Sequence, residues 1–263
     1  MEIHGICDDR FGPVREAFTA SLRDGRDGSD VGASVAVLLD GEPVVDLWGG
    51  YTDRERTRPW RQDTITNVWS LTKTMTALCA LVLADRRELD LSAPVAKYWP
   101  EFGTAGKDGI EIRHVLGHTA GLPDWDRPMA LDDLCDWEKA TSLLARQSPR
   151  WTPGTASGYH RFTHGFLIGE VIRRVCGQSH GVDLVLGIPV RFGVGYALNA
   201  TDAPIATPSP RTCYWGGRGG SLVVNDLDVR VTVAYVMNQM SHLGLTDPRP
   251  RKLLQSVYTA LAG

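Results

Sequence analysis

The sequence has 263 residues, of which 43% are hydrophobic and 22% charged, and its formal net charge is −3. This length is sufficient for one large domain with a continuous core, and the composition is that of an ordinary globular protein. The small negative charge gives no electrostatic basis for binding nucleic acid or an anionic membrane surface, so we expect neither as a partner. No run of about 18 apolar residues suggests a membrane span.

Five cysteines are scattered along the chain without a CxxC motif. The first ten residues, MEIHGICDDR, carry acids where a secretory signal needs basic residues followed by an apolar run. An odd number of thiols without such a signal indicates reduced cysteines, so we expect a cytoplasmic protein.

The first third of the chain predicts a helix, a hairpin and a second helix. Pro13 opens VREAFTASLRDG, an amphipathic segment closed by Gly25. The β-rich runs ASVAVLLD and PVVDLWGG follow, and the Asp40-Gly41 pair between them predicts a hairpin turn. From Ser70 the pattern becomes helical, because LTKTMTALCALVLADRREL is rich in Leu, Ala and Met.

The middle of the chain predicts helices, and the last third predicts mainly strands. IRHVLGHTAGLPDW indicates a short helix, and LDDLCDWEKATSLLARQ and RFTHGFLIGEVIRRVCG indicate one longer helix each. RFGVGYALN, CYWGG, GSLVVND and VRVTVAYVMNQM are strand-like, and PRKLLQSVYTALAG closes the chain as a helix. Because the elements are segregated, we predict an α+β fold in which both ends of the chain build one antiparallel sheet.

Ser70 and Lys73 lie one helical turn apart at the start of a predicted helix, so their side chains share a face. An amine in that position can take the serine proton when the amine is neutral, and burial and nearby positive charge favour that state. A Ser-x-x-Lys pattern also occurs about once by chance in a chain of this size. The pair alone therefore does not establish a nucleophile.

Two later segments carry further candidates. Tyr159 follows the turn-rich WTPGTASG, and a tyrosine near a serine and a lysine can relay a proton to a leaving group. A half-buried core tyrosine is the alternative. The glycine cluster WGGRGG, residues 215–220, lies between strand-like runs, where glycines mark close approach of a ligand or another backbone. That suits a wall of N–H donors for an oxyanion, and an ordinary bulge is the alternative.

Together these segments resemble the serine β-lactamase-like superfamily, most closely its class C branch and esterase relatives. The segments on which this resemblance rests are VWSLTKTMTALCALVLADRRELDL, HVLGHTAGLPDW, WTPGTASGYH and WGGRGGSLVV with AYVMN, in that order. The resemblance implies the β-lactamase/transpeptidase-like fold, an antiparallel sheet flanked by N- and C-terminal helices, with a helical lobe and a cleft. We expect a single domain over 1–263, with a sheet lobe at about 1–69 and 190–263 and a helical lobe at about 70–189.

The resemblance also implies roles for the matching residues. Ser70 would be the acylated nucleophile, Lys73 its general base, and Tyr159 the group that assists proton transfer to and from the leaving group. Arg161 departs from this pattern, because an asparagine or serine normally stands two residues after the tyrosine.

The third motif of the superfamily is Lys-Thr-Gly in β-lactamases and often His-Gly-Gly or Trp-Gly-Gly in the esterases. Trp215, Gly216 and Gly217 match the esterase form. The oxyanion donors would then be the backbone N–H groups of Ser70 and Arg218. Relatives have a long stretch between the predicted helix that ends in RRVCG and the strand run RFGVGYALN. In this sequence only QSHGVDLVLGIPV fills that gap. We therefore expect a reduced helical lobe, and a homodimer whose second chain covers part of the cleft.

Two histidine pairs, His114 with His118 and His160 with His164, have the i, i+4 spacing that places zinc ligands on one helix face. Neither pair has the adjacent glutamate of the zinc proteases, so we expect no metal and no cofactor. The predicted strands do not alternate with helices, which argues against an α/β-hydrolase.

The leading hypothesis is a serine hydrolase that cleaves a small-molecule carboxylic ester, or an amide, through an acyl-enzyme on Ser70. An ester is favoured because Trp215 replaces the cation that grips a β-lactam carboxylate. Two alternatives remain. One is an acyltransferase that uses the same acyl-enzyme. The other is a non-hydrolytic binding protein, or an isomerase or cyclase, that has recruited the cleft.

Overall fold

The structure is a computed structural model that describes residues 2–22, 30–176, 191–192, 196–199 and 205–263. The chain divides into two compact units. The sheet unit comprises Met1–Leu71, Pro189–Arg191 and Ala197–Gly263, and the helical unit comprises Thr72–Ile188 and Phe192–Tyr196.

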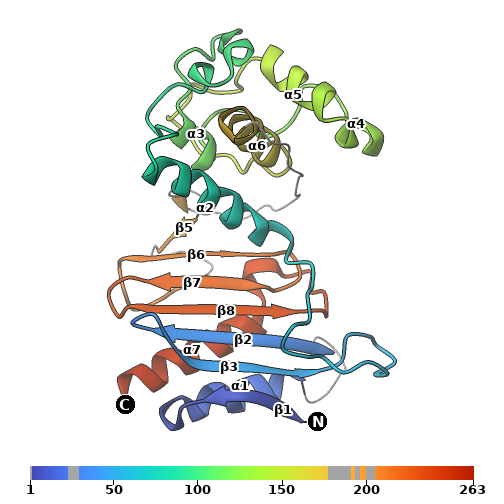
Figure 1. The fold of residues 1–263 in the computed structure, drawn as a ribbon, viewed down its shortest axis with the longest axis vertical. Helices are drawn as coiled ribbons and strands as arrows, with labels where there is room; N and C mark the ends of the chain where they lie inside the picture. The colour runs from blue at the N-terminus through green and yellow to red at the C-terminus, as the bar shows by residue number, and fades with distance from the viewer. Residues whose placement is uncertain (1, 23–29, 177–190, 193–195, 200–204) are drawn as a thin grey trace. The chain divides into compact units, whose positions relative to one another are not determined.

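An antiparallel sheet is the frame of the sheet unit (Figure 1). The strands are β1 (Ile3–Cys7), β2 (Gly32–Leu39), β3 (Glu42–Gly50), β4 (Arg191–Phe192), β5 (Ala197–Leu198), β6 (Thr212–Gly216), β7 (Leu222–Asp226) and β8 (Val231–Met237). Their order in the sheet is β1-β3-β2-β8-β7-β6-β5-β4. Strand β2 pairs with β8 from Ala33↔Met237 to Leu39↔Val231, so strands from both ends of the chain meet at the centre. This confirms the predicted antiparallel α+β architecture.

The hairpin between β2 and β3 turns at the predicted pair. Asp40 and Gly41 have φ angles of 53° and 87°, and a two-residue type I′ turn requires positive φ at both positions. Strand β1, in contrast, was not predicted. It is a short edge strand paired only with β3 among the described pairings, and its middle residues are exposed, so its sequence lacks a clear apolar alternation.

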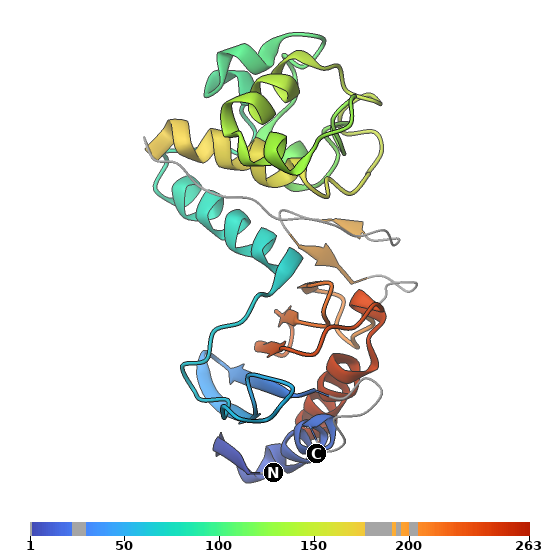
Figure 2. The same ribbon diagram turned by 90° about the vertical axis from the view of Figure 1, so that its right-hand side faces the viewer.

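Two helices from opposite ends of the chain cover one face of the sheet (Figure 2). They are α1 (Gly12–Leu22) and α7 (Pro248–Ala262), both predicted. Helix α1 buries Phe18, and α7 buries Val257. Asp247 caps α7 by accepting the backbone N–H of Arg249 at 2.9 Å, and Pro248 occupies the first helical position, where its missing N–H costs nothing.

The helical unit contains α2 (Thr72–Asp85), α3 (Ile112–Leu116), α4 (Leu131–Cys135), α5 (Trp137–Arg146) and α6 (Thr163–Cys176). The prediction of one helix over LDDLCDWEKATSLLARQ was wrong, because α4 and α5 are separate. The break is at Asp136, whose backbone is extended and whose carboxylate accepts the N–H of Lys139 at 2.9 Å. An aspartate used as an N-cap starts a new helix instead of continuing the old one.

A buried lysine closes the other end of α5. The Lys107 ammonium is fully buried and donates to the carbonyl oxygens of Thr104 at 2.9 Å, Ala145 at 3.0 Å and Gln147 at 2.5 Å. Burial lowers the pKa of Lys107 to about 8. Carbonyls at a helix C-terminus lack intrahelical partners, so this side chain supplies the missing donors.

None of the five cysteines forms a disulfide in the structure. Among the described residues, no helix combines the length and the apolar character needed to cross a membrane.

Candidate active site

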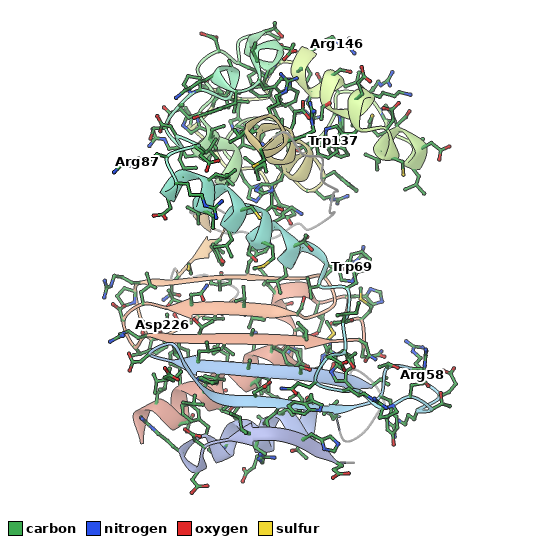
Figure 3. The ribbon with its side chains drawn as sticks, viewed as in Figure 1. Arg58, Trp69, Arg87, Trp137, Arg146 and Asp226 are labelled. Carbon is green, nitrogen blue, oxygen red and sulfur yellow. The ribbon has the colours of Figure 1, made fainter. Side chains whose placement is uncertain are left out.

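Ser70 lies in η2 (Trp69–Leu71), a single turn of 3-10 helix that runs directly into α2. Trp69 (Figure 3) has a φ of 52°, in the left-handed region that is strained for a bulky side chain. Two hydrogen bonds hold the turn: the Trp69 N–H donates to Asn67 Oδ1 at 2.8 Å, and the Leu71 N–H donates to the Val68 carbonyl at 3.2 Å. The candidate nucleophile is therefore buried in a constrained turn.

The glycine cluster packs against this turn within the sheet unit. A Cβ atom on Gly217 would lie 2.2 Å from the Val68 carbonyl oxygen, which only a glycine avoids. Ser221 Oγ donates to the same oxygen at 3.1 Å, and the Gly217 N–H donates to the Ser221 carbonyl at 2.9 Å. The predicted close approach of another backbone at this cluster is thus observed. Binding of an oxyanion by the N–H groups of Ser70 and Arg218 stays a prediction.

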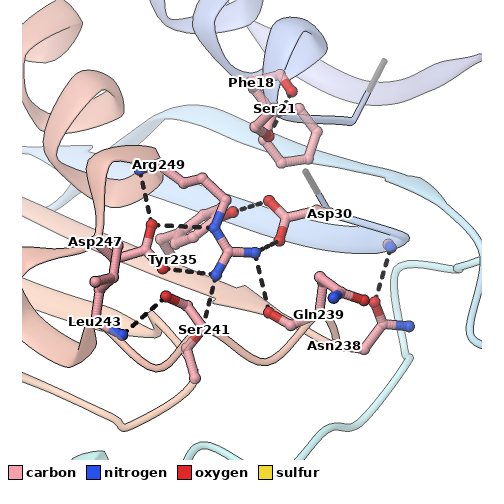
Figure 4. A network of polar contacts seen from close by, with 12 residues as sticks. Phe18, Ser21, Asp30, Tyr235, Asn238, Gln239, Ser241, Leu243, Asp247 and Arg249 are labelled. Atoms are coloured by element: carbon pink, nitrogen blue, oxygen red, sulfur yellow. Dashed lines mark hydrogen bonds and ion pairs between the residues drawn. The ribbon is translucent and has the colours of Figure 1, made fainter. Parts of the chain in front are cut away.

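A buried ion-pair network contacts the glycine cluster at Gly219 (Figure 4). The guanidinium of Arg249 donates to the Gly219 carbonyl at 2.8 Å, to Asp30 at 2.5 Å and to Asp247 at 2.7 Å. The Tyr235 hydroxyl also donates to Asp30. Desolvation raises the pKa of Asp30 to about 6 although Arg249 opposes that shift. These residues were missed in the sequence, because nothing local links residues 30, 219 and 249.

Trp215 is in β6 and only 2% exposed, whereas Arg218 is exposed. The indole therefore presents little free surface in this conformation. The contact of Trp215 with an apolar part of the substrate remains a prediction.

Lys73 and Tyr159 come together within the helical unit. Lys73, in the first turn of α2, is 3% exposed, and its Nζ lies 5.2 Å from the centroid of the Tyr159 ring. Two candidates separated by more than eighty positions in the sequence are thus neighbours. The amine thus lies beside the tyrosine ring, and proton transfer between Lys73 and the Tyr159 hydroxyl stays a prediction.

Three buried histidines form a cluster that contacts Tyr159 through His118. The ring centroid of His118 lies 4.9 Å from that of Tyr159, 4.8 Å from that of His164 and 5.5 Å from that of His160. Burial lowers the pKa of His160 to about 4 and holds the pKa values of His118 and His164 well below their usual range. All three imidazoles are therefore neutral at physiological pH.

Of the two i, i+4 pairs considered from the sequence, His160 and His164 both belong to this cluster, whereas His118 joins them without His114. His114 stays apart and accepts the N–H of Glu111 at 3.2 Å. His160 Nε2 accepts the Leu122 N–H at 3.1 Å, so its lone pair is already used. Across the described residues, no three or more potential ligand side chains are placed to hold a metal ion.

Arg161, which stands where the second motif usually has asparagine, is exposed. Its guanidinium lies over the Phe162 ring, 5.5 Å from the centroid, and its backbone N–H donates to the Tyr159 carbonyl at 2.9 Å. The described contacts of Arg161 therefore tie it to the start of α6.

Comparison with known proteins agrees with this arrangement. Residues 18–184 match the model of the β-lactamase family. The chain is 41% identical to the esterase/β-lactamase LipL of Mycobacterium tuberculosis over 67% of this chain and 40% of that protein. It is 36% identical to esterase EstB of Burkholderia gladioli over 61% of this chain and 45% of that protein. The chain thus spans less than half of these curated relatives. A solved family VIII carboxylesterase is similar with a TM-score of 0.88 and 29% identity, covering 99% of this chain and 100% of that one.

Proposed function

Because the chain belongs to the β-lactamase family, we propose that it is a serine hydrolase that cleaves carboxylic esters through an acyl-enzyme on Ser70. The observation that carries this proposal is the close packing of Gly217 on the turn that holds Ser70. That packing supports the proposal, because backbone N–H groups of a cluster held against the nucleophile turn would be suited to stabilise a tetrahedral oxyanion.

In the proposed reaction, Ser70 Oγ attacks the ester carbonyl carbon while its proton moves to a neutral Lys73. The carbonyl oxygen takes the negative charge and accepts hydrogen bonds from the N–H groups of Ser70 and Arg218. The carbon–oxygen bond to the alcohol then breaks, and Tyr159 passes the proton to the leaving oxygen. Water attacks the acyl-enzyme by the reverse proton route, which releases the acid and restores Ser70.

A neutral ester is the proposed substrate because Trp215 stands where β-lactamases carry a cation. A cation pairs with the carboxylate of a β-lactam through charge-assisted hydrogen bonds. Tryptophan has one N–H donor and an apolar face, so it cannot replace that pairing.

Transfer of the acyl group to an alcohol or amine is the alternative use of the same intermediate, and product analysis with an added alcohol distinguishes it from hydrolysis. We propose the cytoplasm as the location, supported by the absence of a disulfide among the five cysteines.

The test is covalent labelling. A fluorophosphonate probe should add once to the protein, because an activated serine oxygen attacks phosphorus as it attacks a carbonyl. Intact-protein mass spectrometry should show the adduct on the wild type and none on Ser70→Ala. An adduct of equal yield on Ser70→Ala would show that another residue is the nucleophile.

A further inference from the structure

His118 contacts both chain neighbours of Tyr159 and the tyrosine itself. The Gly158 N–H donates to the His118 carbonyl at 3.0 Å, and the His160 N–H donates to His118 Nδ1 at 3.1 Å. The imidazole packs against the Tyr159 ring with a centroid distance of 4.9 Å and an interplanar angle of 57°. One residue thus holds the chain before, at and after Tyr159.

The backbone of His118 is unusual. Its φ is 57°, in the left-handed region that glycine and asparagine adopt more readily than histidine. It follows α3, and its N–H donates to the Val115 carbonyl at 3.1 Å. Histidine tolerates a positive φ better than most residues with a side chain, and the contacts of the imidazole hold it in this conformation.

The hydrogen bond to Nδ1 also defines the protonation state of His118. A ring nitrogen that accepts an N–H carries no proton, so His118 is the neutral tautomer with its proton on Nε2. Burial and the neighbouring His164, His160 and Lys73 lower the pKa of His118 and favour this neutral form. The acceptor is therefore available throughout the physiological range.

We propose that His118 is a positioning residue that holds the phenol of Tyr159 beside Lys73 for proton transfer. The proposal rests on the function proposed above, in which Tyr159 carries the leaving-group proton. Lys73 Nζ lies 5.2 Å from the Tyr159 centroid, and a small displacement of the ring would change that geometry. His118 acts through Tyr159 and needs no contact with the substrate.

The first test is a double-mutant cycle on ester hydrolysis. His118→Ala should lower kcat by about 10²-fold with little change in KM, because misplacement of a catalytic group by about 1 Å has that effect. In a Tyr159→Phe background, the same change should lower kcat by less than about threefold, since the group that it positions is gone. Losses that multiply in the double variant would overturn the proposal.

A matched variant separates positioning from general damage. In His118→Asn the side-chain oxygen replaces Nδ1 as acceptor for the His160 N–H, and asparagine tolerates the left-handed backbone. This variant should recover most of the kcat lost in His118→Ala. Equal kcat values in the two variants, with equal melting temperatures, would contradict the role of the Nδ1 hydrogen bond.

The second test needs no activity. In protein labelled with 3-fluorotyrosine, the resonance of Tyr159 is identified by its loss in Tyr159→Phe. His118→Ala should shift or broaden that fluorine signal, and His118→Asn should restore it. His114→Asn, outside the contacts with Tyr159, is the control. An unchanged Tyr159 signal in His118→Ala refutes positioning, even in a protein without esterase activity. If the signal shifts but the fluorophosphonate probe does not label Ser70, only the proposed function is refuted.

Discussion

A Cβ atom at Gly217 would lie 2.2 Å from the carbonyl oxygen of Val68, two residues before the candidate nucleophile. Gly217→Ala should therefore push the glycine cluster and the Ser70 turn apart and destabilise the protein by about 1–3 kcal/mol, the usual effect of overpacking. Fluorophosphonate labelling of Ser70 should slow by more than tenfold. Gly109→Ala is the control, because a Cβ there meets nothing within 4 Å. Labelling at the wild-type rate would show that the contact is not needed by the nucleophile.

Removal of the proposed base should affect acylation directly. Lys73→Ala should lower the acylation rate by on the order of 10²–10⁴, the effect of losing a positioned general base. Stopped-flow release of the alcohol from a chromogenic ester measures this step. Lys97→Ala, at an exposed lysine of the same unit, should retain the wild-type rate. Near-wild-type acylation in Lys73→Ala would mean that another base accepts the serine proton.

Selectivity should depend on Trp215. The wild type should have a much higher kcat/KM for a neutral ester than for a cephalosporin. Trp215→Lys should narrow this ratio by losing ester activity, since burial of an apolar side-chain-sized group contributes about 1.5–3 kcal/mol. Trp215→Phe retains an apolar face and should keep the preference. A fall in melting temperature with an unchanged ratio would assign Trp215 to packing alone, and wild-type preference for the cephalosporin would overturn the esterase proposal.

Acid should destabilise the protein through its buried histidines. The pKa of His160 is about 4 in the native state against an ordinary value of 6.5, so the unfolded chain binds a proton at a higher pH than the native protein does. Stability is therefore complete above about pH 6.5 and falls as the pH drops toward 4, by up to about 3 kcal/mol from this residue. Burial lowers the pKa values of His118 and His164 too, so their contributions have the same sign.

Denaturant unfolding measured from pH 7 to pH 4 tests this sign. His160→Gln should flatten the dependence of the unfolding free energy on pH. His242→Gln, at an exposed histidine, should leave the slope as it is in the wild type. An equally steep curve in His160→Gln would contradict the assignment.

The expected homodimer remains a prediction, and α2 offers apolar surface to a second copy of the chain. Met75, Leu78 and Val82, exposed by 50%, 47% and 41%, recur at the spacing of one helix face. Light scattering at micromolar concentration should give twice the mass of one chain, and Leu78→Glu should shift the population to monomers. Leu131→Glu, at an exposed leucine of α4, should not. A monomeric wild type would count against the prediction.

Local signals in the sequence were read correctly where the structure depends on neighbouring residues. The turn at Asp40-Gly41 follows from the ease with which this pair adopts positive φ. The predicted helix after Ser70 is α2, which carries Lys73 in its first turn, whereas Ser70 itself lies in the preceding 3-10 turn, and a shared face for the two side chains stays a prediction. Asp136 shows the limit of such reasoning, since a capping aspartate inside an amphipathic pattern was treated as part of one helix.

Contacts between distant segments were not accessible in the same way. Arg249 reaches Gly219 and Asp30 only because the sheet brings three separate segments together. The histidine cluster also depends on tertiary packing, and the i, i+4 rule paired His118 with His114 although its partners are His160 and His164. Such positions carry no periodicity or turn signal of their own.

The pairing of β2 with β8 has a consequence for how the protein comes to be folded in the cell. The Ser70 turn is synthesised in the first third of the chain, but the glycine cluster and β8 arrive only in the last third. Until these segments have been synthesised, the edge of β2 that pairs with β8 is unpaired and the Ser70 turn lacks the glycine cluster that packs against it. The nascent protein therefore cannot assemble its nucleophile site before the glycine cluster and β8 have been synthesised, and until then its exposed strands need protection from aggregation.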